Sequence, residues 1–178
     1  MKKRILYIVN VDWFFLSHRL PIALEMQKKG YEVHLALKVT SKFKELESYG
    51  FDIHDINFTR KGVNIFFELK VLYQLFFLVR NIKPSICHLV TAKGIVFGGL
   101  VCKLLKIPCV AAFSGLGNIF SSNKVSMTVL RPIVLLIYRY VFNRNDVAAI
   151  FQNRDDLDQL KEFDIFSNEK IFLIKGSG

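Results

Sequence analysis

The chain has 178 residues, of which 52% are hydrophobic and 22% are charged, and it contains only 10 Gly and 4 Pro. This composition excludes a disordered chain and the collagen-like and low-complexity classes, and the length fits one domain with its own core. With 25 basic and 15 acidic residues the net charge is +10, which indicates an anionic partner.

Short apolar runs, typical of strands buried on both faces, alternate along the chain with helix-like segments. The predicted strands are, in chain order, Ile5–Val9, Glu32–Leu37, Phe51–Ile56, Ser85–Val90, Cys109–Phe113, Val147–Phe151 and Lys170–Ile174. The predicted helices are Leu20–Lys29, Lys42–Tyr49, Asn64–Asn81, Gly94–Leu105, Lys124–Phe142 and Asp155–Phe163. This alternation predicts an α/β fold, a doubly wound and mostly parallel sheet with helices on both faces.

Sequence features argue against a signal peptide, a membrane-spanning helix, disulfides and a metal site. The Lys-Lys-Arg start followed by Ile5–Val9 resembles a signal peptide, but the apolar run is too short, so a buried first strand is predicted. No membrane-spanning helix is predicted, because Arg131, Pro132 and Arg139 interrupt the most apolar segment. The three cysteines lie in apolar runs and are predicted to be buried free thiols, and the four histidines are too scattered to predict a metal site.

Sheets of this kind bind ligands outside the carboxyl ends of their strands, so the loops there are the candidate site. The first loop, residues 10–19, contains no glycine, and neither dinucleotide-binding nor P-loop motifs occur, which disfavours NAD binding and P-loop chemistry. Asp12, His18 and Arg19 in this loop can meet a sugar or a phosphate. Alternatively, the loop's aromatic residues pack under the sheet edge and Arg19 is solvated.

The loop after the fourth strand has the features of an anion site. Thr91 is expected to cap the following helix, whose N-terminal amides favour negative charge, and Lys93 adds a positive charge. His88, within the strand, is interpreted as a core histidine. Earlier in the chain, Ser41 is expected to cap the helix predicted over residues 42–49, and Asn64 the helix predicted up to residue 81.

Two glycines follow the fifth predicted strand. Gly115 and Gly117 flank Leu116 and either expose backbone amides to a ligand or form a plain turn. After the sixth strand, Asn153 either caps the next helix, a role open to Asp155 as well, or reaches into a cleft.

Five segments, in this order, resemble the N-terminal half of a bacterial family-four glycosyltransferase: LYIVNVDWFFLSHRLPIALEMQKKGYEVHLA, TAKGIVFGGLVCKLLKIP, FSGLGNIF, AIFQNRDDLDQL and IKGSG. The resemblance covers essentially the whole chain and is greatest to enzymes that assemble O-antigen, capsule or lipid-linked glycans. It implies the GT-B architecture, in which two Rossmann-like domains face each other across a cleft. Residues 1–178 are then expected to be the acceptor-binding domain, and the donor-binding C-terminal domain is expected to be absent from this chain.

The resemblance implies a retaining transferase that moves a hexose or N-acetylhexosamine from a nucleotide-sugar to a lipid-linked glycan acceptor in surface polysaccharide synthesis. It implies no cofactor and no metal, and this chain alone is expected to be inactive. The candidate cleft residues are Asp12, His18, Thr91, Lys93, Gly94, Ser114, Gly115, Leu116, Gly117 and Asn153. Many relatives have a histidine after the fifth strand where this chain has Ser114, so no catalytic residue is assigned.

The positive charge has two candidate partners, nucleic acid and an anionic membrane. No nucleic-acid-binding motif is present, so the inner face of the cytoplasmic membrane is favoured, with the protein cytoplasmic and peripheral. The membrane-facing candidates are Lys124, Arg131, Arg139 and Arg144, which surround the apolar segment 129–141. Each basic residue near an anionic leaflet is worth about 1 kcal/mol. The alternative is that segment 129–141 is core and its flanking charges are solvated.

Two other functions remain open at this point. The first is a non-catalytic membrane- or partner-docking module with a glycosyltransferase-like fold, which Ser114 and the glycine-free first loop favour. The second is one half of a UDP-sugar epimerase, an enzyme class with a similar two-domain architecture.

Overall fold

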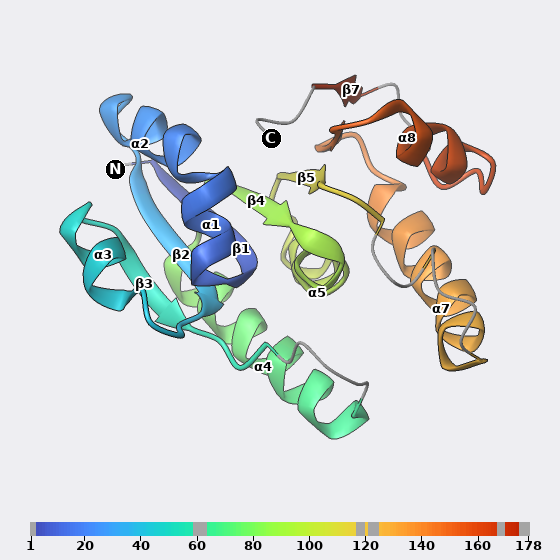
Figure 1. The fold of residues 1–178 in the computed structure, drawn as a ribbon, viewed down its shortest axis with the longest axis horizontal. Helices are drawn as coiled ribbons and strands as arrows, with labels where there is room; N and C mark the ends of the chain where they lie inside the picture. The colour runs from blue at the N-terminus through green and yellow to red at the C-terminus, as the bar shows by residue number, and fades with distance from the viewer. Residues whose placement is uncertain (1–2, 59–63, 117–119, 121–124, 167–169, 175–178) are drawn as a thin grey trace.

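The computed structural model describes residues 3–58, 64–116, 120, 125–166 and 170–174 (Figure 1). The strands are β1 (Arg4–Val11), β2 (Glu32–Lys38), β3 (Asp52–Asp55), β4 (Ile86–Val90), β5 (Cys109–Phe113), β6 (Val147–Phe151) and β7 (Ile171–Leu173). The helices are α1 (Asp12–His18), α2 (Leu20–Lys28), α3 (Phe43–Ser48), α4 (Ile65–Ile82), α5 (Thr91–Leu105), α7 (Val125–Phe142) and α8 (Arg154–Lys161).

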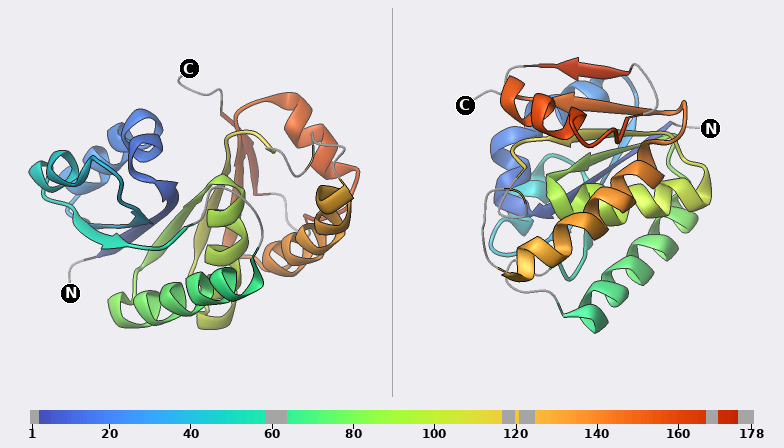
Figure 2. Two further views of the ribbon diagram at one scale, coloured as in Figure 1. Left: turned by 60° about the horizontal axis from the view of Figure 1, so that its bottom comes forward. Right: turned by 90° about the vertical axis from the view of Figure 1, so that its right-hand side faces the viewer.

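The described strands form one sheet with the order β3-β2-β1-β4-β5-β6-β7, and every neighbouring pair is parallel. Helices α1, α2 and α3 cover one face of the sheet, and α4, α5, α7 and α8 cover the other (Figure 2). The predicted doubly wound sheet is therefore confirmed. Because all the strands run the same way, their carboxyl ends share one edge.

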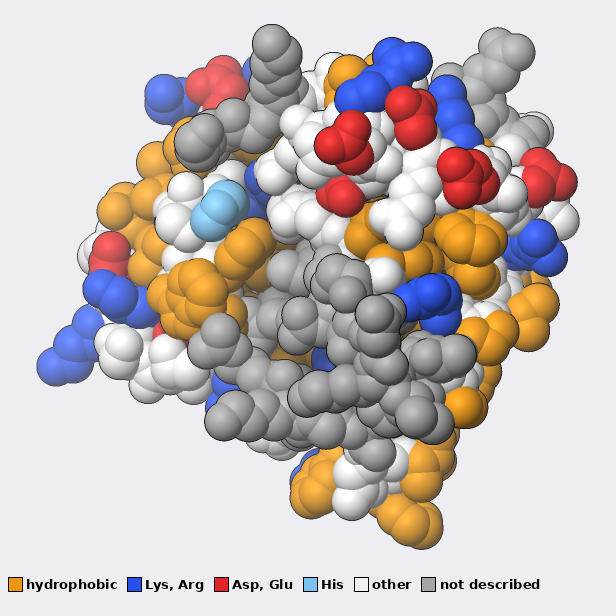
Figure 3. All heavy atoms as spheres, turned by 45° about the vertical axis from the view of Figure 1, so that its right-hand side comes forward, with side chains coloured by type: hydrophobic (Ala, Val, Ile, Leu, Met, Phe, Trp, Pro, Cys, Tyr) orange, Lys and Arg blue, Asp and Glu red, His pale blue; other side chains and the backbone are white. Residues whose placement is uncertain are grey.

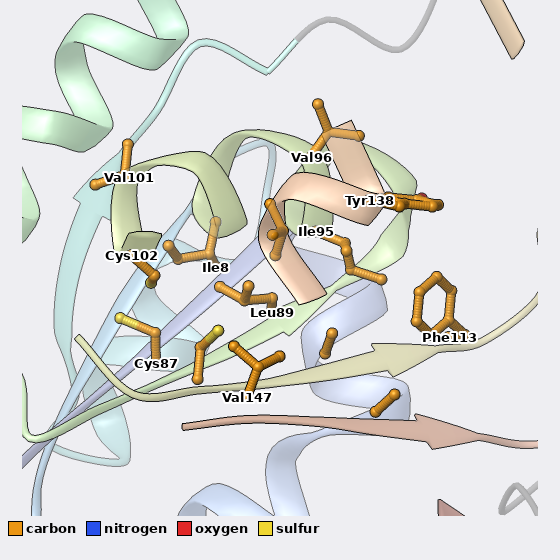
Figure 4. Packing of buried hydrophobic residues seen from close by; sticks show 14 of the residues in the cluster. Ile8, Cys87, Leu89, Ile95, Val96, Val101, Cys102, Phe113, Tyr138 and Val147 are labelled. Carbon is orange, nitrogen blue, oxygen red and sulfur yellow. The ribbon is translucent and has the colours of Figure 1, made fainter. Parts of the chain in front are cut away.

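Helix α5 lies unusually close to the sheet. A Cβ atom on Gly94 would lie 2.7 Å from the carbonyl oxygen of Ile8, and one on Gly98 would lie 2.6 Å from Cδ2 of Leu89. Both distances are shorter than real Cβ contacts, so the glycines permit this approach. Ile8 and Leu89 lie beneath α5 in the core (Figure 4).

The buried thiols and one of the predicted caps are confirmed. Cys87, Cys102 and Cys109 are all buried and free. The side chain of Asn64 accepts a hydrogen bond from the Phe66 amide and caps α4.

One helix was missed by the prediction, and the most apolar helix agrees with it. Helix α1 was not expected, because its residues were interpreted as part of a loop. Helix α7 agrees with the helix predicted over residues 124–142, and Pro132 lies inside it. Within the described residues, no helix combines the length and the apolar character needed to cross a bilayer.

Candidate functional site at the carboxyl ends of the strands

The candidate residues follow strands that are neighbours in the sheet. β4 pairs with both β1 and β5, and β6 pairs with β5. Asp12, Thr91, Ser114 and Asn153 directly follow these four strands or stand two residues beyond one of them, so they lie along one edge (Figure 1). Gly117 and Lys124 lie outside the described residues.

The carboxylate of Asp12 is fully buried and holds the turn after β2. It accepts hydrogen bonds from the backbone amides of Thr40 (2.6 Å), Ser41 (3.2 Å) and Lys42 (3.1 Å) and from the Thr40 hydroxyl (2.7 Å). Burial by itself raises the pKa of this carboxyl group, but the hydrogen bonds outweigh that effect and hold the pKa below its ordinary value. Asp12 therefore acts within the protein, and Ser41 does not cap α3 as predicted, because Lys42 occupies the cap position without a side-chain bond.

His18 lies on the last turn of α1 and is held there by two contacts. Its ring stacks on Phe14 with 4.1 Å between centroids, and its Nδ1 lies 2.6 Å from the Ser17 hydroxyl. Trp13, on the first turn of the same helix, is 40% exposed. Helix α1 thus presents aromatic rings beside the strand edge.

Thr91 is the first residue of α5 rather than its cap, so the predicted capping role is wrong. Val90 is the N-cap and makes no side-chain cap bond, while Thr91 has a φ of 68°. A β-branched residue is strained in this left-handed region, at a cost of about 1–3 kcal/mol, and such strain is common at functional sites. The Thr91 hydroxyl oxygen is buried and has no hydrogen-bond partner among the described residues.

Lys93, on the first turn of α5, forms an ion pair with Glu68 of α4. The Glu68 side chain is 8% exposed and that of Lys93 is 23% exposed. The lysine charge is therefore already balanced in the free protein, which the sequence did not reveal because its partner lies 25 residues earlier in the chain. Gly94 has a packing role, since a side chain there would meet the β1 backbone.

The loops after β5 and β6 contain the remaining candidate residues. Gly115 is exposed and has a φ of +112°, a conformation that favours glycine, whereas Leu116 is buried. Asn153 caps α8 by accepting from the Asp156 amide at 2.7 Å, which confirms one of its two predicted roles. Ser114 is half-buried next to Gly115.

A buried polar cluster lies under the α1–α2 junction. Arg19 is 6% exposed and donates a hydrogen bond to the His18 carbonyl, so the interpretation of Arg19 as a solvated residue is wrong. The ring of His88 stacks on Tyr7 with 5.2 Å between centroids, and His88 Nε2 has no hydrogen-bond partner among the described residues. Burial, with a smaller contribution from the Arg19 charge, lowers the pKa of His88 to about 3.

Of the basic residues predicted to face a membrane, the three that the structure describes hydrogen-bond to backbone carbonyls of other segments. Arg131 donates to the Phe120 carbonyl, and Arg139 donates to the Phe163 carbonyl through two nitrogens. Arg144 pairs with Asp146 and donates to the Ile107 carbonyl, and its side chain is only 11% exposed. It precedes β6 and therefore lies at the opposite edge of the sheet from the candidate site.

The parallel sheet and the position of the candidate residues at its carboxyl edge define a Rossmann-like α/β domain. The chain belongs to the glycosyl transferase 4-like family, whose model matches residues 4–153. The family resemblance seen in the sequence is confirmed.

One curated protein that is similar in sequence is the N,N'-diacetylbacillosaminyl-diphospho-undecaprenol alpha-1,3-N-acetylgalactosaminyltransferase of Campylobacter jejuni. It is 25% identical over 173 residues, which cover 92% of this chain and 46% of that protein. The chain therefore spans about half the length of the curated relative that it matches.

Solved structures share the fold at low sequence identity. A glycosyltransferase from Rickettsia africae has a TM-score of 0.67 and 17% identity, and the match covers 98% of this chain and 43% of that one. The UDP-N-acetylglucosamine 2-epimerase of Rickettsia bellii has a TM-score of 0.66 and 15% identity, with 99% and 45% covered. These likenesses establish the fold shared by both enzyme classes.

Replacing Asp12 by Asn is expected to destabilise the chain by about 3 kcal/mol, because an amide cannot accept from the three backbone donors as a carboxylate does, and bonds to charged groups are worth about 1.5–3 kcal/mol each. Urea unfolding measures the loss. Since the folded pKa of Asp12 is lowered, its contribution is complete above the ordinary carboxyl pKa and disappears as the pH falls through the lowered value. The control Asp158→Asn, at an exposed ion pair, should cost no more than about 0.5 kcal/mol, and an equal loss in both variants contradicts the assignment.

His88 is expected to remain neutral in the folded chain down to a pH near 3. The unfolded chain takes up this proton near pH 6.5, so stability is complete above that pH and falls by up to about 1.4 kcal/mol per pH unit as the pH drops toward 3. His34 and His54, whose pKa values burial also lowers, add to this slope. An NMR titration of the His88 ring measures the pKa directly, and His88→Phe should reduce the slope. Titration of His88 near pH 6.5 contradicts the prediction.

Proposed function

We propose that residues 1–178 form the acceptor-side domain of a retaining glycosyltransferase. The enzyme moves a hexose or N-acetylhexosamine from a nucleotide-sugar to a lipid-linked glycan in surface polysaccharide synthesis. The observation that carries this proposal is the family match over residues 4–153, combined with strained and exposed backbone at neighbouring strand ends. The undecaprenyl-linked acceptor in the name of the Campylobacter relative supports the acceptor class.

Glycosyl transfer needs a held acceptor hydroxyl and stabilisation of the departing diphosphate. In this proposal Thr91, Ser114 and Gly115 line the acceptor side of the cleft, and a C-terminal domain outside this chain binds most of the donor. The Thr91 hydroxyl, buried without a partner among the described residues, is available to a bound sugar or phosphate. Asp12 and Asn153 support the loops around this edge and do not contact substrate.

Membrane association at the inner face of the cytoplasmic membrane is part of the proposal and rests on the outer layer formed by α4, α5 and α7. These helices carry six Lys or Arg residues, and the buried Glu68 is their one acidic residue. They also provide eleven of the seventeen large hydrophobic side chains that are exposed among the described residues. In Figure 3 hydrophobic side chains gather along the lower right of the molecule, and in Figure 1 α4 lies at the bottom and α7 at the right. Apolar side chains with a surplus of basic residues suit an anionic bilayer surface.

A UDP-sugar epimerase is the second candidate function, because the TM-score of the Rickettsia bellii epimerase nearly equals that of the Rickettsia africae glycosyltransferase. An epimerase converts a free UDP-sugar and needs no lipid acceptor. The basic and apolar outer layer favours the transferase, because a water-soluble substrate does not require it.

The full-length protein is expected to transfer a radiolabelled sugar from one of a panel of nucleotide-sugars to a polyprenyl-diphosphate glycan. Product extraction into organic solvent measures the transfer, and NMR of the anomeric proton tests for retention of configuration. Conversion of a UDP-sugar without any acceptor supports the epimerase. Absence of both reactions with the entire panel, together with vesicle binding, supports the non-catalytic docking module.

Reversing two exposed charges of the outer layer is expected to weaken binding to anionic vesicles. In the double variant Lys70→Glu with Arg80→Glu, two attractions of about 1 kcal/mol each are lost, so the partition coefficient should fall by at least about tenfold. Co-sedimentation with vesicles containing phosphatidylglycerol measures it. The double variant Lys29→Glu with Lys44→Glu changes the net charge equally on the other face and should have a much smaller effect. Equal losses in both variants contradict docking through α4, α5 and α7.

A further inference from the structure

An apolar groove lies between α4, α5 and α7 and begins at the first turn of α5. Its volume is about 190 Å³, and its lining includes Ile65 of α4, Val96 and Phe97 of α5, and Ile133 and Ile137 of α7. The ion pair of Glu68 and Lys93 belongs to the same lining. The exposed lining of the groove is apolar, so Lys93 and Glu68 line it through their carbon atoms, while their charged groups pair with each other next to the strand edge.

We propose that this groove takes the isoprenyl unit next to the diphosphate of a polyprenyl-diphosphate acceptor, and that Lys93 holds that diphosphate. The proposal rests on the proposed function and specifies where the acceptor lipid binds. An apolar cavity of about 150 Å³ holds benzene, which has six carbons. The groove is thus large enough for one five-carbon unit and too small for a whole polyprenyl chain.

The charges of the three helices favour this occupant. A diphosphate is anionic, and the only negative charge on α4, α5 and α7 is Glu68, which is already paired with Lys93. In the free protein this pair prevents a partly buried lysine charge from remaining uncompensated. A bound diphosphate brings more negative charge to Lys93 than one carboxylate does, and it lies near the first turn of α5, where the helix dipole favours anions.

The path available to the lipid chain of the acceptor also agrees with this assignment. Ala92 and Lys93 line the groove, and they directly follow Thr91 at the strand edge. At the α4 end of the groove, Ile65 is 61% exposed and its neighbour Phe66 is 80% exposed. A lipid chain that starts at the strand edge therefore passes along the groove to the exposed apolar side chains that we propose contact the bilayer.

The test is titration of the 178-residue chain with farnesyl diphosphate, and separately with inorganic diphosphate, by isothermal calorimetry. The proposal predicts saturable binding of one farnesyl diphosphate, at least about tenfold tighter than binding of inorganic diphosphate. Ile133→Glu places a charge in the groove and should weaken farnesyl diphosphate binding by about tenfold or more, while binding of inorganic diphosphate changes less than about twofold.

The matched control is Leu136→Glu, which adds the same charge to α7 at a position that is 62% exposed and is not part of the groove lining. It should leave farnesyl diphosphate binding within about twofold of the original. Ile133→Ala gives a second, milder variant if the glutamate prevents folding, and it should weaken binding about threefold. Equal effects of Ile133→Glu and Leu136→Glu, or non-saturable partitioning of the lipid, overturn the proposal.

The role of Lys93 is tested by the double variant Lys93→Gln with Glu68→Gln, which replaces the ion pair by two neutral amides. It should weaken binding of both farnesyl diphosphate and inorganic diphosphate by about tenfold, whereas Lys103→Gln, at the other end of α5, should not. If the double variant binds both ligands as the original does, Lys93 does not hold the diphosphate.

Failure of this inference is distinguishable from failure of the proposed function. Transfer by the full-length enzyme to a polyprenyl-diphosphate acceptor with the same KM before and after Ile133→Glu overturns the groove assignment alone. Loss of dimerisation on Ile133→Glu with unchanged lipid binding would identify the groove as a contact between two copies of the chain, and it also overturns the proposal. If farnesyl diphosphate binds saturably and its binding depends on Ile133, but the full-length protein transfers no sugar, the lipid site is supported and the proposed transferase function is wrong.

Discussion

The close approach of α5 to the sheet is the constraint on which the arrangement of the candidate site depends. Gly94 and Gly98 allow the helix backbone to lie directly against β1 and the side chain of Leu89, and Gly99 faces Val141 of α7 in the same way. A helix held at this distance brings its first turn to the carboxyl edge of the sheet. It also draws α4 and α7 inward on either side, and the groove with the Lys93–Glu68 pair lies between these three helices.

The architecture was predictable from the sequence because the strand signal is strong in this chain. Cys109–Phe113 and Val147–Phe151 are short apolar runs with one and two β-branched residues, and the structure forms strands of the same five residues in each case. Helix α1 was missed for the opposite reason. Its Trp-Phe-Phe-Leu run has apolar residues at consecutive positions, so no helical period stands out in seven residues.

The candidate site was predictable in location and not in residue roles, because its decisive contacts join distant parts of the chain. Asp12 bonds to amides 28–30 residues away, and Lys93 pairs with a glutamate 25 residues away. Thr91 has the side chain of a helix cap, yet its left-handed backbone makes it the strained first residue of α5. Backbone strain of this kind leaves no mark on local sequence preference.

The distribution of charge distinguishes the helical layer that we propose contacts the membrane from the strand edge that we propose holds the sugar of the acceptor. Acidic residues occur on α2, α3 and α8, whereas on the outer layer of α4, α5 and α7 the one acidic residue is buried and paired. The net charge of these three helices is +5, half of the +10 of the whole chain, and the same layer exposes most of the large apolar side chains. Because Lys93 and Thr91 are two residues apart on one helix, the proposed lipid site and the strand edge lie within about one helical turn, or about 5 Å, of each other. A lipid-linked acceptor can thus keep its chain at the bilayer while its diphosphate and first sugar lie at the carboxyl ends of β4 and β5.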